Sequence, residues 1–245
     1  MLRDRLAPFF VAPPGARLDQ IRRFQRPLGL VAAVSWVVYG MTTLLVAAWP
    51  RFPVDVEVLH WIDGRLLYRG PISYVLSHLG AAPVLTPLVV VACAYLVLRR
   101  RALVAGAILG LSYGLVGVLA TLGKGILRRP EPSKEADELG YAYPSGHAAA
   151  AVVAWGGLAL TLYLVWLLEG QPLPRRRVFL WAGAIVSLVS MVSLLRSAHW
   201  LTDLTGGVAL GLACLTTVTV IVLRWWLPRQ AAVLVAPEVR PTRSG

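Results

Sequence analysis

Residues 102–122 read ALVAGAILGLSYGLVGVLATL, a run of 21 residues without a charged side chain. As an α-helix that rises about 1.5 Å per residue, this run would be about 30 Å long, which is the hydrocarbon thickness of a bilayer. Arg99, Arg100 and Arg101 precede the run, and Lys124 follows it. Because charged side chains are costly at the centre of a membrane, this pattern predicts a transmembrane helix that carries its charges at both ends.

The composition of the whole chain also indicates a membrane protein. Of the 245 residues, 57% are hydrophobic and 15% are charged, and the mean hydropathy is +0.67. Further apolar runs of similar character lie at residues 28–49, 82–98, 147–168, 178–195 and 203–226. The run at 82–98 is short for a span unless its helix begins earlier, near Ile72. The sequence therefore predicts an all-α protein, a polytopic membrane helix bundle with about six transmembrane helices.

These runs divide the chain into three regions. Residues 1–26 form a basic N-terminal segment, residues 27–228 the six-span domain, and residues 229–245 a tail that we expect to be disordered. The two cysteines, Cys93 and Cys214, lie within apolar runs, so we expect them to form neither a disulfide nor a metal site.

Basic residues set the expected orientation. The net charge of +12 raises nucleic acid as a partner, but basic flanks of membrane spans explain it better, so we expect membrane lipids and no nucleic acid. With six spans and a cytoplasmic N-terminus, 16 of the 24 lysines and arginines lie inside, including the short-loop clusters at 99–101 and 175–177. Such an excess marks the cytoplasmic side of a cell (plasma or inner) membrane. Both termini are then cytoplasmic, and residues 51–70, 123–146 and 199–203 meet on the outer face.

The first chemical signal is a cluster of cations after the third run, formed by Lys124, Arg128 and Arg129. Arginine forks suit phosphate oxygens and lysine supplies a point charge, so this cluster predicts phosphate binding. The alternative is a set of side chains that snorkel to lipid headgroups. Phosphate binding is favoured because the outer side of a membrane normally carries fewer basic residues.

The second signal is Pro144-Ser145-Gly146-His147, which precedes an alanine-rich apolar run. Ser145 can cap the helix, and Gly146 lets the backbone approach a ligand closely. Free N–H groups and the positive end of the helix dipole make an anion site there, and His147 is placed to act on that anion. The alternative is a plain helix cap beside an incidental histidine.

The third signal is the set Arg196, His199 and Asp203. On a helix, His199 and Asp203 share one face, so the carboxylate can orient the imidazole and leave its other nitrogen free to attack. If the helix extends back to Arg196, the arginine lies on the same stripe. In the alternative interpretation Asp203 only caps the start of a membrane span. One carboxylate can also do both, capping the span and orienting His199.

Taken together, the three signals resemble the type 2 phosphatidic acid phosphatase superfamily, whose pattern is Lys-x6-Arg-Pro, Pro-Ser-Gly-His and Ser-Arg-x5-His-x3-Asp. The resemblance implies that His199 attacks phosphorus to form a phosphohistidine, that Asp203 orients it and that His147 protonates the leaving group. It also implies that Lys124, Ser145 and the Gly146 N–H hold the phosphoryl oxygens, with no metal and no cofactor.

Two positions depart from the family pattern, since Glu131 and Ser193 stand where the family has arginine. Arg129 lies two residues before the first of these positions, and Arg196 lies three residues after the second. We expect Arg128 or Arg129, together with Arg196, to replace the missing phosphate contacts.

The sequence thus predicts an integral membrane phosphatase that hydrolyses a lipid phosphate at the outer face without a metal. Its substrate is expected to be a polyprenyl diphosphate or phosphate, or a glycerophospholipid phosphate. Two alternatives stay open. One is a lipid-linked phosphotransferase, in which an acceptor alcohol replaces water. The other is a catalytically weakened lipid-phosphate-binding protein of the same fold.

Overall fold

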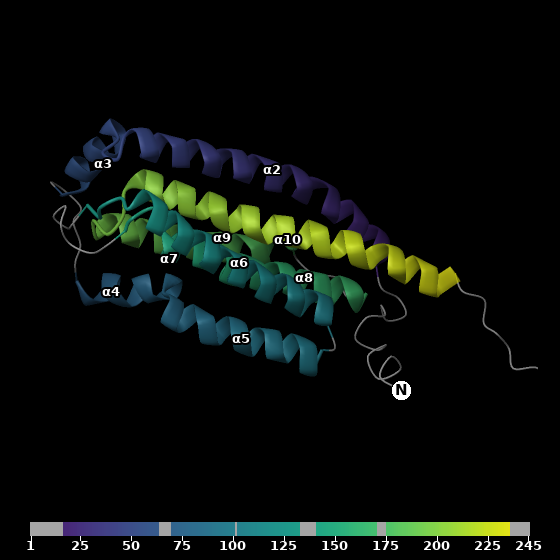
Figure 1. The fold of residues 1–245 in the computed structure, drawn as a ribbon. Helices are drawn as coiled ribbons and strands as arrows, with labels where there is room; N and C mark the ends of the chain where they lie inside the picture. The colour runs from purple at the N-terminus through teal and green to yellow at the C-terminus, as the bar shows by residue number, and fades with distance from the viewer. Residues whose placement is uncertain (1–16, 64–69, 101, 133–140, 171–174, 236–245) are drawn as a thin grey trace, which may run out of the picture.

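The structure, a computed structural model, describes residues 17–63, 70–100, 102–132, 141–170 and 175–235. This part of the chain is built from helices and loops, with an isolated β-bridge between Pro130 and Tyr141. Figure 1 shows long helices that lie side by side in an elongated bundle. The prediction of an all-α helix bundle is confirmed.

The helices follow one another in the order α2 (Leu18–Ala48), α3 (Pro53–Asp63), α4 (Pro71–Ser77), η1 (His78–Gly80), α5 (Ala82–Leu98), α6 (Leu103–Leu127), α7 (Gly146–Ala151), η2 (Val152–Gly156), α8 (Gly157–Leu168), α9 (Arg175–Leu195) and α10 (Leu201–Val235). Among the described residues, five helical stretches are long and apolar enough to cross a membrane, and α7, η2 and α8 together form one of them. The bent pair of α4–η1 and α5 makes a sixth.

The bend in this sixth stretch depends on Gly80. The segments Pro71–Gly80 and Ala82–Leu98 meet at an angle of 42°. A Cβ atom on Gly80 would lie 2.5 Å from a side-chain carbon of Val189 and 3.1 Å from the carbonyl oxygen of His147. Glycine therefore lets the bend pack closely against α7 and α9, and the helical structure does begin near Ile72.

Two helices extend beyond their predicted ends. The first, α2, begins at Leu18 and so includes part of the basic N-terminal segment. The last, α10, continues to Val235, so residues 229–235 of the expected tail are helical. Those residues read RQAAVLV, without a glycine or proline that would end a helix. Residues 1–16 and 236–245, the rest of the two terminal segments, lie outside the described residues.

The central helix is α10, which packs against α2, α6, α7 and η2. Glycines on one side of α10 allow this close packing, because Cβ atoms on Gly206, Gly207 and Gly211 would lie within 2.5–2.7 Å of atoms of Tyr143, Ser145 and Val152 respectively. The C-terminal ends of α2, α6 and α9 and the N-terminal ends of α7 and α10 lie at one end of the bundle (Figure 1). All three sequence motifs are located at these helix ends, so the fold brings them together.

Candidate active site

Ser145 defines the start of the helix that carries His147. Its Oγ accepts a hydrogen bond from the N–H of Ala148 at 3.4 Å, so Ser145 caps α7 as predicted. The N–H of the completely buried Ser145 donates to the carbonyl oxygen of Asp203 at 3.0 Å. This bond joins the second motif directly to the third.

Two histidines from different motifs lie close together in the site. His147 lies in the first turn of α7, His199 lies just before α10, and their ring centroids are 6.3 Å apart. His199 is buried, with 6% of its surface exposed, whereas His147 is half-buried. A phosphoryl group between the two rings could contact both, as a nucleophile and a general acid require.

Asp203 lies beside His199, as predicted, but at a greater distance than a hydrogen bond. Its Oδ2 is 3.8 Å from His199 Nδ1 and accepts a 2.9 Å hydrogen bond from the N–H of Trp200. Trp200 directly precedes α10, so the Asp203 carboxylate caps the backbone N–H at the start of the helix, as the acidic residue of a capping box does. His199 Nδ1 is buried and has no hydrogen-bond partner in the described part of the chain.

The cations of the first motif point in different directions. Lys124, in the last turn of α6, donates a hydrogen bond to the carbonyl oxygen of Tyr141. Arg128 has a φ of 47°, which ends α6, and its exposed side chain donates to the carbonyl oxygen of Gly125 at 3.2 Å. The turn at Arg128 sends the next residue, Arg129, into the protein.

Arg129 is completely buried and binds carboxylates. Its Nη1 donates to Asp203 Oδ1 at 2.5 Å, and its Nη2 donates to Asp55 Oδ2 at 2.7 Å. Nη1 also donates to Thr202 Oγ1 at 2.7 Å, and Nε donates to the carbonyl oxygen of Pro50 at 2.8 Å. The guanidinium that the sequence predicts to contact phosphate is therefore bound by acceptors of the protein itself.

Arg196 does not lie on the predicted helical stripe. The helix α9 ends at Leu195, and Ser197 has a φ of 53°, so the chain turns between Arg196 and α10. Arg196 instead extends to α4, where Nη1 donates to Ser77 Oγ at 3.2 Å and the guanidinium carbon lies 5.4 Å from the Tyr74 ring centre. The condition for a shared stripe, a helix that extends back to Arg196, is therefore not met, because the positive φ at Ser197 interrupts the helix.

Asp55 also belongs to this arrangement, although it lies outside the three sequence motifs. It lies on α3, in the outer segment 51–70 that was expected to lie over the site, and only 1% of its surface is exposed. Its Oδ1 accepts from the N–H of Thr202 at 2.9 Å. No local motif surrounds Asp55, so only its burial identifies it.

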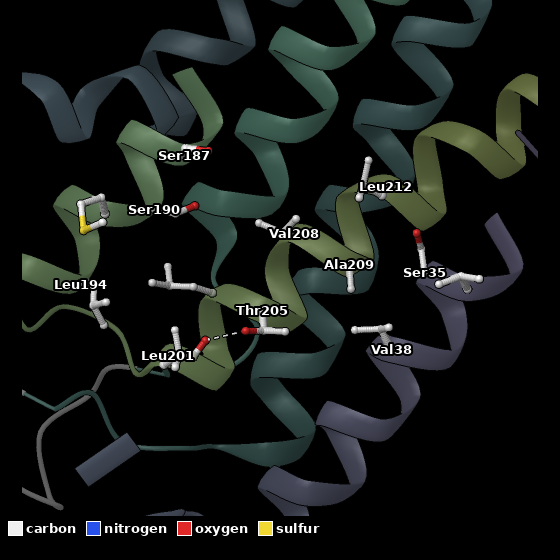
Figure 2. Close-up of a pocket in the computed structure, with 13 residues that line it drawn as sticks. Ser35, Val38, Ser187, Ser190, Leu194, Leu201, Thr205, Val208, Ala209 and Leu212 are labelled. Atoms are coloured by element: carbon white, nitrogen blue, oxygen red, sulfur yellow. Dashed lines mark hydrogen bonds between the residues drawn. The ribbon is translucent and has the colours of Figure 1, made fainter. Parts of the chain in front are cut away.

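Two hollows lie near these residues. A cavity of about 420 Å³ is lined by Lys124, Gly146 and His147 together with residues of α5 and α6 such as Tyr113. A groove of about 560 Å³ lies between α2, α9 and α10, and Figure 2 shows its lining, which includes Val208. None of the described residues that line this groove carries a charge. Phosphate chemistry therefore fits the first hollow.

The chain is similar to known membrane phosphatases. The family model described as PAP2 superfamily matches residues 101–227. Phosphatidylglycerophosphatase B of Bacillus subtilis (strain 168) is 30% identical over 139 residues, which are 56% of this chain and 67% of that protein. In fold, the chain is similar to the crystal structure of a transmembrane PAP2-type phosphatidylglycerolphosphate phosphatase from Bacillus subtilis. The match has a TM-score of 0.59 and 24% identity, and covers 83% of this chain and 98% of that one.

Proposed function

Because the chain belongs to the PAP2 superfamily and is a multi-pass membrane lipid phosphatase, we propose that it cleaves its substrate through a phosphohistidine on His199. The proposal rests on one observation above all, the pair His147 and His199. Their ring centroids are 6.3 Å apart, and Oδ2 of the buried Asp203 lies 3.8 Å from Nδ1 of His199. This arrangement supplies a nucleophile, a proton donor and an orienting carboxylate.

The reaction has two steps. First, His199 Nε2 attacks phosphorus, the bond from phosphorus to the leaving oxygen breaks, and His147 gives that oxygen a proton. Next, His147 takes a proton from a water molecule, whose oxygen attacks the phosphohistidine and breaks the phosphorus–nitrogen bond. Inorganic phosphate leaves and both histidines are restored. Asp203 stabilises the positive charge that His199 gains while it is bonded to phosphorus.

Lys124, Ser145 and Gly146 hold the phosphoryl oxygens in this proposal. Lys124 and Gly146 line the same cavity as His147. Gly146 also begins the continuous helical stretch Gly146–Leu168, whose free N–H groups favour an anion. Arg128 and Arg196, at the same end of the bundle, stay predicted contacts for the remaining charge of the headgroup.

The proposed substrate is a lipid with a terminal phosphate. The apolar part of the 420 Å³ cavity, between α5 and α6, would accept the lipid chain next to its phosphate. Because the Bacillus relative is named a phosphatidylglycerophosphatase, phosphatidylglycerol phosphate is the first lipid to test. A polyprenyl diphosphate is the second, because it offers the same terminal phosphate on an apolar chain.

The outer face is the proposed side of the reaction. Arg99, Arg100, Arg176 and Arg177 lie at the end of the bundle opposite the two histidines. Because basic residues collect on the cytoplasmic side, that end would face the cytoplasm.

Phosphate release from purified protein in detergent tests the function. The assay would contain chelator and no added metal, and would compare phosphatidylglycerol phosphate, phosphatidic acid and a polyprenyl diphosphate. We expect release that persists in chelator, is lost in His199→Ala and is retained in His60→Gln, an exposed histidine on α3. Wild-type protein denatured at alkaline pH, where the phosphorus–nitrogen bond of phosphohistidine survives, should carry phosphate on His199.

Other outcomes would select the alternatives. Transfer of phosphate to an added alcohol in preference to water would indicate a phosphotransferase. If folded protein binds the lipids tightly but releases no phosphate, the proposed hydrolysis is contradicted and the protein is a lipid-phosphate-binding protein.

A further inference from the structure

Asp55 is connected to the predicted catalytic residues although it lies outside all three motifs. Its Oδ1 accepts from the N–H of Thr202 at 2.9 Å, and its Oδ2 accepts from Thr202 Oγ1 at 2.6 Å. Thr202 is the second residue of α10, so Asp55 caps the helix that carries Asp203. A carboxylate at a helix N-terminus is also stabilised by the helix dipole.

Arg129 links Asp55 to Asp203. The guanidinium donates from Nη2 to Asp55 and from Nη1 to Asp203, and all three side chains are completely inaccessible to solvent. The guanidinium carbon lies 5.2 Å from the centre of the Trp200 ring, whose Nε1 donates to the carbonyl oxygen of Pro130 at 2.9 Å. Pro50, Asp55 and the segment 200–203 therefore hold the guanidinium in one orientation.

The charges of this cluster do not cancel. Two carboxylates share one guanidinium, so the formal charges of these three groups sum to −1 beside His199 Nδ1. If Arg129 were paired with Asp203 alone, it would neutralise the carboxylate that faces the imidazole. Asp55 takes one side of the guanidinium, so that the cluster can still stabilise positive charge on His199.

We propose that Asp55 is a positioning residue for phosphoryl transfer, which holds Asp203 against His199 through Arg129 and Thr202 and keeps the buried cluster negatively charged. The inference rests on the proposed role of His199 as the nucleophile. Asp55 lies on α3, between the first two membrane-spanning stretches. From there it affects the rate of the chemical step without contacting the substrate.

Three variants test the inference: Asp55→Asn, Asp55→Glu and the control Glu57→Gln, which removes an exposed carboxylate from the same helix. Asp55→Asn keeps the shape and an acceptor for the Thr202 N–H but loses the charge. We expect it to lower kcat per folded protein by about 10–100-fold, as is typical when a buried partner of an active-site group is lost, with little change in KM. Asp55→Glu should retain more kcat than Asp55→Asn, and Glu57→Gln should match the wild type.

The opposite order of the two variants would overturn the inference. If Asp55 only caps α10, Asp55→Asn should be the better enzyme, because it keeps the acceptor in place. A wild-type kcat in Asp55→Asn would also overturn it. Should Asp55→Asn not fold, Thr202→Val serves instead, since it preserves every charge but removes the hydroxyl between Asp55 and Arg129. It is expected to lower kcat several-fold, and an unchanged kcat would contradict the proposal.

Binding of orthovanadate separates this inference from the proposed function. Its vanadium can accept a histidine nitrogen in a geometry like that of the transition state, without turnover. If the wild type binds vanadate and releases no phosphate, the proposed hydrolysis fails, while weaker vanadate binding by Asp55→Asn would still support positioning. Equal binding by both would overturn positioning. A folded chain that neither releases phosphate nor binds vanadate would remove both proposals.

Discussion

The N–H of Ser145 donates a 3.0 Å hydrogen bond to the carbonyl oxygen of Asp203, and this bond joins the start of α7 to the start of α10. One turn further along α10, a Cβ atom on Gly207 would lie 2.5 Å from the carbonyl oxygen of Ser145. The contact between the two helices is thus made by backbone atoms on both sides. The relative position of His147 and His199 depends on it.

Gly207→Ala should therefore separate the two helices. The added methyl group meets backbone at 2.5 Å and the Cβ of Ala148 at 3.2 Å, so we expect a loss of about 1–3 kcal/mol of stability and a larger loss of activity. Thermal unfolding in detergent and phosphate release would measure the two effects. Gly114→Ala is the control, because a Cβ there has no atom within 4 Å. Wild-type stability and activity in Gly207→Ala would show that the helices can move apart without cost.

Arg129→Gln should destabilise the fold. It leaves Asp55 and Asp203 buried without a counter-ion, which typically costs about 3–5 kcal/mol. The matched control for unfolding is Arg128→Gln, because the side chain of Arg128 is exposed and its loss should change stability by less than about 0.5 kcal/mol. Unfolding by denaturant would compare the variants. A rise in KM for Arg129→Gln without any loss of stability would instead support the phosphate contact predicted from sequence.

His147→Gln should lower activity in a way that depends on the leaving group. A lipid alcohol needs a proton as it leaves, so we expect its release to fall by about 10²–10⁴-fold. p-Nitrophenyl phosphate releases a stable phenolate, so its hydrolysis should fall much less. Steady-state rates with both substrates would measure the difference. Equal losses would mean that His147 holds the phosphate and does not protonate the leaving group.

Labelling of introduced cysteines should reveal the orientation in the membrane. In a chain whose native Cys93 and Cys214 are replaced by alanine, Arg128→Cys and Arg99→Cys would each place one thiol at an exposed position. Since basic residues collect on the cytoplasmic side, a membrane-impermeant maleimide added to intact cells should label position 128 and spare position 99 until the cells are permeabilised. The reverse pattern would put the active site on the cytoplasmic side.

The positions of the helices could be predicted closely because the bilayer imposes a local rule. Each span needs a continuous apolar run of a certain length, and that run can be recognised without knowing what it packs against. By the same rule the run at 82–98 was too short unless its helix began near Ile72, and the helical structure does begin at Pro71, with a bend of 42°. The bend could not be predicted, since it depends on the contact of Gly80 with Val189 and His147.

The site was only partly predictable. The motifs identified Ser145, His147 and His199, because Ser145 caps the helix that directly follows it and Asp203 is only four residues from His199 in sequence. Arg196 does not share a helical face with His199 and Asp203, because one residue with a positive φ, Ser197, interrupts the helix, and the side chain of Arg196 extends to α4. Asp55 was missed, because a single acid in an outer segment looks the same in sequence whether it is exposed or completely buried.

The sequence by itself determined the all-α membrane architecture and the meeting of three motifs at one end of the bundle. Both follow from the length of the apolar runs and from the alternation of successive spans across the bilayer. Only the tertiary structure decided that Arg129 faces Asp55 and Asp203. A buried charge is stable only beside an opposite charge, and here the partners come from segments far apart in the chain, so no local pattern could specify them.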